Sequence, residues 1–272
     1  MKTAEKQITD TVQESESPVL EEQEDGIVRL TLNRPEQYNS LSEAMLATLQ
    51  EKIDAIAENK DARLVILQGA GKAFCAGHDL KEMIATRNET YYKELFQQCS
   101  RMMMSLNKIP QPVIARVHGI ATAAGCQLVG ACDLAVASEE ARFATSGINV
   151  GLFCSTPSVP VSRNIPRKQA MELLLTGEFI DANTALKWGL INRIAKLEKI
   201  DEEVQKLADA ILSKSSVAVF TGKKMFYKQL EKNMEDAYAF AGEIMACNMM
   251  AEDVNEGIDA FVKKRTAVWK GR

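Results

Sequence analysis

The strongest constraint on the fold of this chain is a pattern that occurs twice: a short apolar run, a loop of small residues, and the start of a helix-like segment. Residues 63–83 read "RLVILQGAGKAFCAGHDLKEM", and residues 112–131 read "PVIARVHGIATAAGCQLVGA". Short apolar runs of this kind are typical of strands buried on both faces, as in parallel sheets. Parallel strands need long crossovers, usually helices, so the pattern predicts an α/β fold.

Other segments extend this prediction. Residues 19–35, "VLEEQEDGIVRLTLNRP", predict a β-hairpin that turns at Asp25-Gly26. The spacing from Ser40 to Glu43 fits a capping box and therefore predicts the start of a helix. That helix has four apolar residues at helical spacing, namely Leu46, Leu49, Ile53 and Ile56.

Three parts of different character follow one another along the chain. Residues 1–18 are polar and are expected to form a mobile tail. Residues 19–200 alternate strand and helix patterns and are expected to form the core, whereas residues 201–272 are expected to form a helical region. A chain of 272 residues is long enough to bury a sizeable core.

Composition argues against several classes of partner. The chain has 33 basic and 37 acidic residues, a net charge of −4 and no basic block, which disfavours nucleic acid as the main partner. Its apolar runs are too short to predict a membrane span. The first 18 residues lack the apolar core of a secretory signal and the acid-poor, basic character of a transit peptide, so a cytoplasmic location is expected.

The metal-binding residue types are sparse. Six cysteines form no C-x-x-C pair, and most lie in apolar or Gly-rich surroundings, which predicts free buried thiols in a reducing compartment. The only histidines are His78 and His118, and neither has ligand spacing around it. No metal site is therefore predicted.

The two small-residue loops are candidates for holding a negatively charged oxygen. Between a strand and a helix, backbone N–H groups are left unpaired and the helix dipole adds positive potential. The first loop, "GAGKAF", matches neither a Walker A loop nor the dinucleotide fingerprint. If the loops converge, one N–H from each would stabilise an oxyanion by about 3–4 kcal/mol per donor. The alternative is that glycine serves only the geometry of these turns, and the spacing alone leaves both interpretations open.

Several segments, in a fixed order, carry a family resemblance. They are "LNRPEQYNSL", "GAGKAFCAGHDLKEM", "KIPQPVIARVHGIATAAGCQLVGACDLAVASEEARFA", "GLFCS", "AMELLLTGEFIDANTALKWGLINRI" and "GIDAFVKKR", and they cover most of residues 26–265. Together they resemble the crotonase (enoyl-CoA hydratase/isomerase) superfamily. The resemblance implies a ClpP-like spiral of ββα units with a C-terminal helical region that builds homotrimers, often paired into hexamers.

The resemblance also implies a ligand and a site. The ligand would be a coenzyme A thioester, with no permanently bound cofactor. By position, the oxyanion N–H groups would come from His78 and Ala124, and Asp79, Leu80 and Lys81 would flank the bound CoA. The C-terminal basic residues would reach the CoA phosphates of their own or a neighbouring subunit, or would form a solvated helix face; they are Lys263, Lys264 and Arg265.

Three family positions for catalytic acids are substituted in this chain. The two glutamates of the family's hydratases fall at Gln127 and Gly147, and the acid of some isomerases and dehalogenases falls at Ser155. An amide orients water but cannot take up a proton near neutral pH, and glycine offers no side chain. Loss of general acid–base help typically costs about 10²–10⁴ in rate, so hydratase activity is expected to be poor or absent.

Three functions remain open on the sequence. The chain is an acyl-CoA lyase or isomerase acting through an enolate, a non-catalytic acyl-CoA-binding or regulatory protein, or a thioester hydrolase with water oriented by Gln127 or Ser155. A catalytic role for the His78 side chain is the alternative to an imidazole packed beside the loop. Asp79 and Asp133 are expected to hold the backbone, Asp79 as a helix cap.

Overall fold

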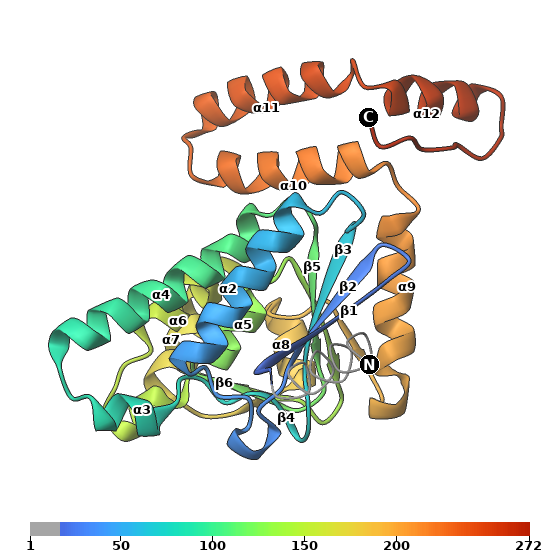
Figure 1. Cartoon of the computed structure of the whole chain (residues 1–272). Helices are drawn as coiled ribbons and strands as arrows, with labels where there is room; N and C mark the ends of the chain where they lie inside the picture. Colours follow the sequence, from blue (N-terminus) through green and yellow to red (C-terminus); the bar gives the residue numbers. More distant parts are fainter. Residues whose placement is uncertain (1–16) are drawn as a thin grey trace, which may run out of the picture.

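Two β-sheets form the frame of the fold (Figure 1). The computed structural model describes residues 17–272. The larger sheet has the strand order β1-β2-β3-β5-β7-β10, and the smaller one has the order β4-β6-β8-β9. The strands of the larger sheet are β1 (Val19–Glu24), β2 (Ile27–Leu32), β3 (Leu64–Gly69), β5 (Val113–Val117), β7 (Leu134–Ser138) and β10 (Arg193–Ala195). Those of the smaller sheet are β4 (Ala73–Cys75), β6 (Ile120–Thr122), β8 (Arg142–Ala144) and β9 (Ile180–Asp181).

Successive strand pairs explain why two sheets form. The pairs β3–β4, β5–β6 and β7–β8 each place one strand in the larger sheet and the next in the smaller one, and each pair is followed by a helical segment. The strands β2, β3, β5, β7 and β10 run parallel, as do β4, β6 and β8. The predicted α/β spiral of ββα units is thus confirmed.

Helices enclose the sheets. The α-helices before β10 are α2 (Glu43–Glu58), α3 (Leu80–Ala85), α4 (Glu89–Lys108), α5 (Ala124–Ala131), α6 (Ser155–Asn164), α7 (Arg167–Thr176) and α8 (Ala182–Trp188). The later ones are α9 (Ile200–Leu212), α10 (Ser216–Leu230), α11 (Met234–Asn248) and α12 (Glu252–Val262). Three short 3-10 helices are η1 (Pro35–Gln37), η2 (Ser146–Val150) and η3 (Leu197–Lys199).

The hairpin and the first helix test the local predictions. Asp25 and Gly26 both have positive φ, 48° and 80°, as a two-residue hairpin turn requires, so the predicted turn is confirmed. The predicted start of α2 is two residues early. Ser42, not Ser40, is the N-cap and accepts a hydrogen bond from the Met45 N–H at 3.1 Å. The Ser40 hydroxyl instead donates to Asp79 at 3.4 Å.

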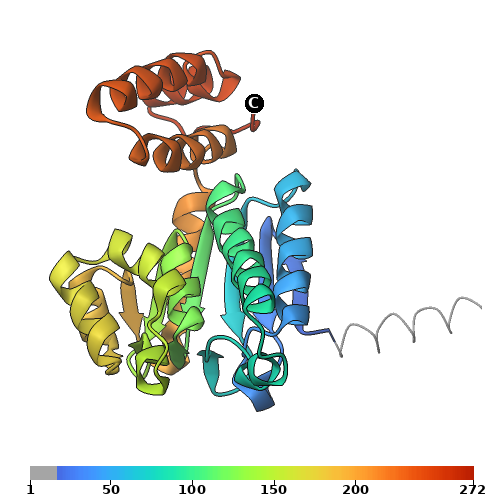
Figure 2. The same ribbon diagram turned by 90° about the vertical axis from the view of Figure 1, so that its left-hand side faces the viewer.

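Packing divides the helices between two faces and one end of the larger sheet. On one face, α2, α4 and α5 share a core with the sheet. On the other, Ile200 and Val204 of α9 pack against apolar residues of β2, β3, β5 and β7. Helices α10–α12 form a layer beyond one end of the sheet (Figure 1; Figure 2), and the smaller sheet lies at the opposite end.

The helical layer exposes many large apolar side chains to solvent. They are Phe226, Leu230, Met234, Tyr238, Met245, Met249, Met250, Ile258, Phe261 and Val262. The division of the chain at residues 18 and 200 stays a prediction, and residues 1–16 of the expected tail lie outside the described residues.

Candidate functional site

The two small-residue loops lie side by side in the structure. Strands β4 and β6 are paired in parallel, with Cys75 opposite Ala121, so the loops that follow leave the sheet at the same edge. Gly77 has a φ of +94°, and a Cβ atom on it would lie 2.9 Å from the Ala123 Cβ and 3.2 Å from the Ala124 nitrogen. Glycine is therefore required at position 77 because the loops touch.

The backbone of the first loop orients the His78 N–H. The Leu41 N–H donates to the Gly77 carbonyl at 2.7 Å, and the Asp79 N–H donates to the Leu41 carbonyl at 3.2 Å. In this extended bridge, backbone N–H groups alternate in direction, so the His78 N–H faces away from Leu41. It finds no acceptor within residues 17–272.

The second loop is held in a strained conformation. Ala123 has φ 51° and ψ −119°, which is a region that glycine adopts far more readily than alanine, and its N–H donates to the Ala144 carbonyl at 3.0 Å. Ala124 then begins α5, so its N–H has no acceptor inside the helix. A Cβ atom on Gly125 would lie only 2.0 Å from the Cys75 carbonyl oxygen. The small residues here therefore allow two backbone segments to approach each other.

The His78 side chain is neutral and lacks partners. Its ring packs edge-on against Phe96 of α4, with 5.5 Å between the ring centroids. Both ring nitrogens are buried without a hydrogen-bond partner among the described residues. Burial lowers the pKa of His78 to about 4. The nearby Leu41 backbone acts in the other direction and raises the pKa, but its effect is smaller. The imidazole is therefore unprotonated near neutral pH and is a weak base.

Asp79 has the structural role that was expected. Its carboxylate caps α3 by accepting from the Lys81 N–H at 3.0 Å, and it pairs with Arg34 at 3.2 Å. Burial opposes ionisation, but these hydrogen bonds and the Arg34 guanidinium hold the pKa of Asp79 below its ordinary value. The Leu80 and Lys81 side chains lie beside it, both exposed to solvent.

Of the three positions at which the resemblance implies catalytic acids, two are buried or closely packed. Gln127 is 3% exposed, and its Oε1 accepts no hydrogen bond from the described residues. Gly147, in η2, leaves no room for a side chain, since a Cβ atom would lie 2.6 Å from the Leu152 carbonyl oxygen and 2.8 Å from the Cys154 Sγ. Ser155, the first residue of α6, is exposed, and its hydroxyl donates to the Phe153 carbonyl at 3.4 Å.

The thiols near these positions are unreactive. Burial raises the pKa of Cys126 and of Cys75 to about 12, and it also raises the pKa of Cys154. Each thiol therefore stays protonated and a poor nucleophile. Among residues 17–272, no cluster of three His, Cys, Asp or Glu side chains could hold a metal ion, and no helix is long and apolar enough to cross a membrane.

The C-terminal basic residues lie far from the two loops within one chain. Helix α12 is at the opposite end of the molecule from α3, β4 and β6 (Figure 1). Lys263 pairs with Asp259 at 2.7 Å, and Arg265 pairs with Glu256 and Asp259 at 2.6 and 2.7 Å. A contact of Lys263 or Lys264 with CoA at these loops would therefore require another subunit.

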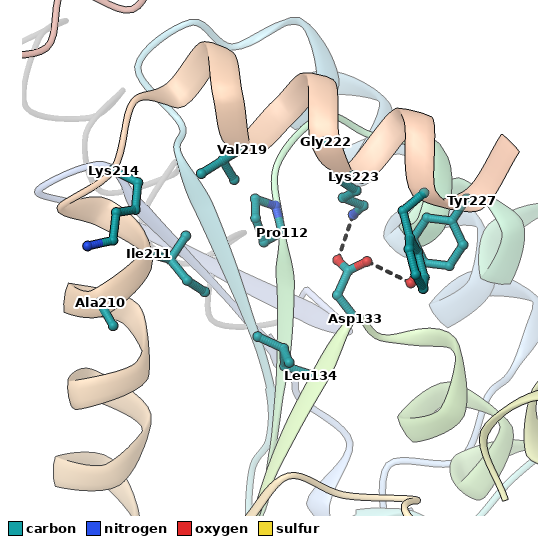
Figure 3. A pocket seen from close by; sticks show the side chains of 11 residues that line it. Pro112, Asp133, Leu134, Ala210, Ile211, Lys214, Val219, Gly222, Lys223 and Tyr227 are labelled. Atoms are coloured by element: carbon teal, nitrogen blue, oxygen red, sulfur yellow. Dashed lines mark hydrogen bonds and ion pairs between the residues drawn. The ribbon is translucent and has the colours of Figure 1, made fainter. Parts of the chain in front are cut away.

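Sequence reasoning missed a second polar cluster, which joins α10 to the core (Figure 3). Asp133 accepts hydrogen bonds from the Val113 N–H and from Tyr227, each at 2.7 Å, and pairs with Lys223 at 2.7 Å. The expected backbone role of Asp133 agrees with the Val113 contact. In the sequence, Lys223 looks like any other lysine of a helix, so no local signal reveals that it is buried.

Comparison with known proteins identifies the family. The model of the enoyl-CoA hydratase/isomerase family matches residues 22–272, and the chain belongs to that family. It is 47% identical to the rat "Enoyl-CoA hydratase domain-containing protein 3, mitochondrial" over 91% of this chain and 82% of the rat protein. For the human protein of that name the identity is 45%, over 93% and 83%. The alanine- and cysteine-rich character of the segments that carry the resemblance predicts this branch, and the prediction is confirmed.

Solved structures confirm the fold. A crystal structure described as enoyl-CoA hydratase from Mycobacterium smegmatis has a TM-score of 0.92 and 54% identity, covering 93% of this chain and 99% of that one. The crystal structure of human enoyl-CoA hydratase domain-containing protein 3 has a TM-score of 0.90 and 46% identity, covering 93% and 100%.

The expected cytoplasmic location is wrong. The similar proteins from rat, mouse, frog, human and zebrafish are all named as mitochondrial. The expectation rested on the composition of residues 1–18, most of which lie outside the described residues. A targeting address is read by receptors and leaves no mark on the composition of the folded part.

Proposed function

We propose that this protein binds an acyl-CoA thioester with the carbonyl oxygen between the His78 and Ala124 N–H groups. The observation that carries the proposal is the contact of the two loops, in which Gly77 brings the first loop against the Ala124 nitrogen. Both N–H groups lack acceptors among the described residues, and the Ala124 N–H lies at the positive end of α5. Such a pair is suited to polarising a carbonyl group.

The side chains around this pair favour holding the thioester over transforming it. Gln127 accepts a hydrogen bond from a hydroxyl or a water but takes up no proton. Position 147 admits no carboxylate, and a histidine with a pKa of about 4 is a weak base. We therefore expect hydration of enoyl-CoA to be at least about 10²-fold slower than in a relative that keeps both glutamates.

Other functions of the family have less support. A lyase or isomerase needs a group that moves a proton at the α-carbon. Near the proposed donors, His78 is a weak base with a pKa of about 4, Cys126 stays protonated, and Asp79 is paired with Arg34. A thioester hydrolase needs an activated nucleophile, whereas the exposed Ser155 hydroxyl donates to a backbone carbonyl. Binding of an acyl-CoA thioester without its transformation is therefore the function that the geometry supports best.

Assembly and location belong to the same proposal. The exposed apolar side chains of α10–α12 support a homotrimer, alone or as a dimer of trimers. The names of the similar animal proteins support a mitochondrial location.

The test combines calorimetry with infrared spectroscopy. Butanoyl-CoA labelled at the thioester carbonyl should bind, and its carbonyl stretch should move to lower frequency because two N–H groups polarise the bond. Absence of binding would contradict the thioester ligand. Binding with an unshifted carbonyl stretch would contradict its placement between His78 and Ala124.

A further inference from the structure

The cluster behind α5 is built around a buried lysine. Lys223 of α10 is 9% exposed, and its ammonium group donates to the carbonyls of Leu106 and Gln111 at 2.7 and 2.8 Å. Its third contact is the ion pair with Asp133 at 2.7 Å. One side chain of α10 thus reaches the last turn of α4, the segment before β5, and the residue before β7.

Asp133 is held by α10 at both of its carboxylate oxygens. Lys223 contacts Oδ2, and the Tyr227 hydroxyl donates to Oδ1 at 2.7 Å (Figure 3). Lys223 and Tyr227 are four residues apart and therefore lie on the same face of the helix. Asp133 also accepts from the Val113 N–H at 2.7 Å, so α10, β5 and the end of α5 meet at this one carboxylate.

Polar contacts, more than apolar packing, set the position of α10 on this side. A groove of about 430 Å³ lies between α9 and α10 beside the ion pair (Figure 3). A Cβ atom on Gly222, which lines the groove, would meet no atom within 4 Å. A buried ion pair adds little stability compared with apolar residues of the same volume, and its best-attested use is to fix register.

The other end of α5 carries the Ala124 N–H. Helix α5 has eight residues and is about 12 Å long, and all of them except Gly130 are buried. Its last carbonyl, of Ala131, accepts from the Asn107 side chain at 2.8 Å, and Asp133 follows two residues later. A short helix in a closely packed interior moves as a unit, so a shift at Asp133 is passed on to Ala124.

We propose that Asp133, Lys223 and Tyr227 form a lock through which the docking of α10 holds α5, and hence the Ala124 N–H, in position to bind a thioester carbonyl. The three are positioning residues, since they lie at the opposite end of α5 from Ala124. The lock ties the candidate site to the helices that expose the apolar assembly surface. This inference rests on the proposed binding of acyl-CoA between His78 and Ala124.

The experiment compares Lys223→Met with Lys224→Met, the replacement of the exposed neighbouring lysine of the same helix. Affinities for butanoyl-CoA and for free CoA are measured by calorimetry on the full chain, together with the carbonyl stretch of the bound thioester. Free CoA has no thioester carbonyl, so its affinity reports whether the rest of the site is intact.

For Lys223→Met, we expect butanoyl-CoA affinity to fall by about threefold to thirtyfold, with a smaller carbonyl shift and an unchanged affinity for free CoA. Lys224→Met should behave as wild type. An equal loss for both ligands, or an unchanged affinity for butanoyl-CoA, would overturn the lock. If wild type itself fails to bind butanoyl-CoA, the proposed function fails first. If Lys223→Met does not fold, Tyr227→Phe, which removes one hydrogen bond, should show the same pattern at smaller size.

Discussion

At the scale of single residues, the candidate site combines two backbone N–H groups, of His78 and Ala124, with neighbouring side chains that are poorly suited to moving a proton. The sequence predicts which loops are involved, because strand, small residues and helix recur in the same order. It does not reveal the pKa of His78, which depends on burial against Phe96 of a distant helix. The packing at Gly147 is equally hidden, since Leu152 and Cys154 approach it only through the course of the following loop.

Gly147→Glu should fail to restore hydration of crotonyl-CoA. The new Cβ atom would lie 2.6 Å from the Leu152 carbonyl oxygen, so the backbone must shift, and we expect a loss of about 1–3 kcal/mol in the free energy of unfolding. Gly222→Ala is the matched control, because its Cβ has open space in a helix and should be neutral or slightly stabilising. Urea denaturation and a hydration assay check both, and a stable, active Gly147→Glu variant would refute the packing argument.

Gln127 should make the protein prefer a 3-hydroxyacyl-CoA. Helical side chains lean toward the helix N-terminus, so we expect the buried amide to lie near the Ala124 N–H and near the third carbon of a thioester held there. A hydroxyl at that carbon gives Oε1 the donor it lacks. We expect 3-hydroxybutanoyl-CoA to bind about tenfold more tightly than butanoyl-CoA. Gln127→Met should abolish the difference and Gln97→Met, at an exposed position, should keep it; equal affinities in wild type would disprove the assignment.

His78 should make the folded state less stable in acid. Its pKa is about 4 when folded and 6.5 when exposed, so the unfolded chain binds a proton that the folded chain does not. Stability from this group is present above pH 6.5 and is lost as the pH falls from 6.5 to about 4. His78→Asn should show a weaker fall in urea midpoint over this range. Parallel curves for both proteins would contradict the assignment.

At the scale of elements, the spacing of apolar residues predicts the interior of a helix better than its first residue. The apolar spacing of α2 is confirmed, because Leu46, Leu49 and Ile53 are all buried. Its start is wrong by two residues, since Ser40 and Ser42 offer the same hydroxyl and only the surroundings decide which of them caps the helix. Ser40 is drawn instead to Asp79 in the next loop.

Ser42→Ala should therefore destabilise the protein more than Ser40→Ala does. Loss of the hydrogen bond to the Met45 N–H should cost about 0.5–2 kcal/mol, as for other N-caps. The 3.4 Å contact of Ser40 is longer and should contribute less. Thermal unfolding of the two variants provides the comparison, and a larger effect at Ser40 would reverse the assignment of the cap.

At the scale of the whole molecule, the C-terminal layer leaves many apolar side chains exposed in a single chain. Phe261 is 85% exposed and Met250 is 82% exposed, and both belong to the layer formed by α10–α12. We therefore expect this surface to form an interface between copies of the chain. The sequence resemblance predicts the trimer, whereas hydrophobicity alone does not show which face of each helix is left uncovered.

Light scattering after size exclusion should give about 90 kDa for a trimer or twice that for a hexamer, given a chain of 30.0 kDa. Phe261→Asp should shift the protein toward the monomer, since it places a charge on the exposed apolar surface. Leu197→Asp is the control, because Leu197 is an exposed apolar residue that lies outside α10–α12, in η3. A monomeric wild type would contradict the assembly.

The packing around Gly147 also limits how this site could be redesigned. A glutamate at position 127 would replace a side chain of the same length, whereas one at position 147 would disturb Leu152 and Cys154. The surrounding loop occupies the volume that a carboxylate side chain at position 147 would need. Building both acids into this site would therefore require concerted changes in that loop in addition to the change at position 127.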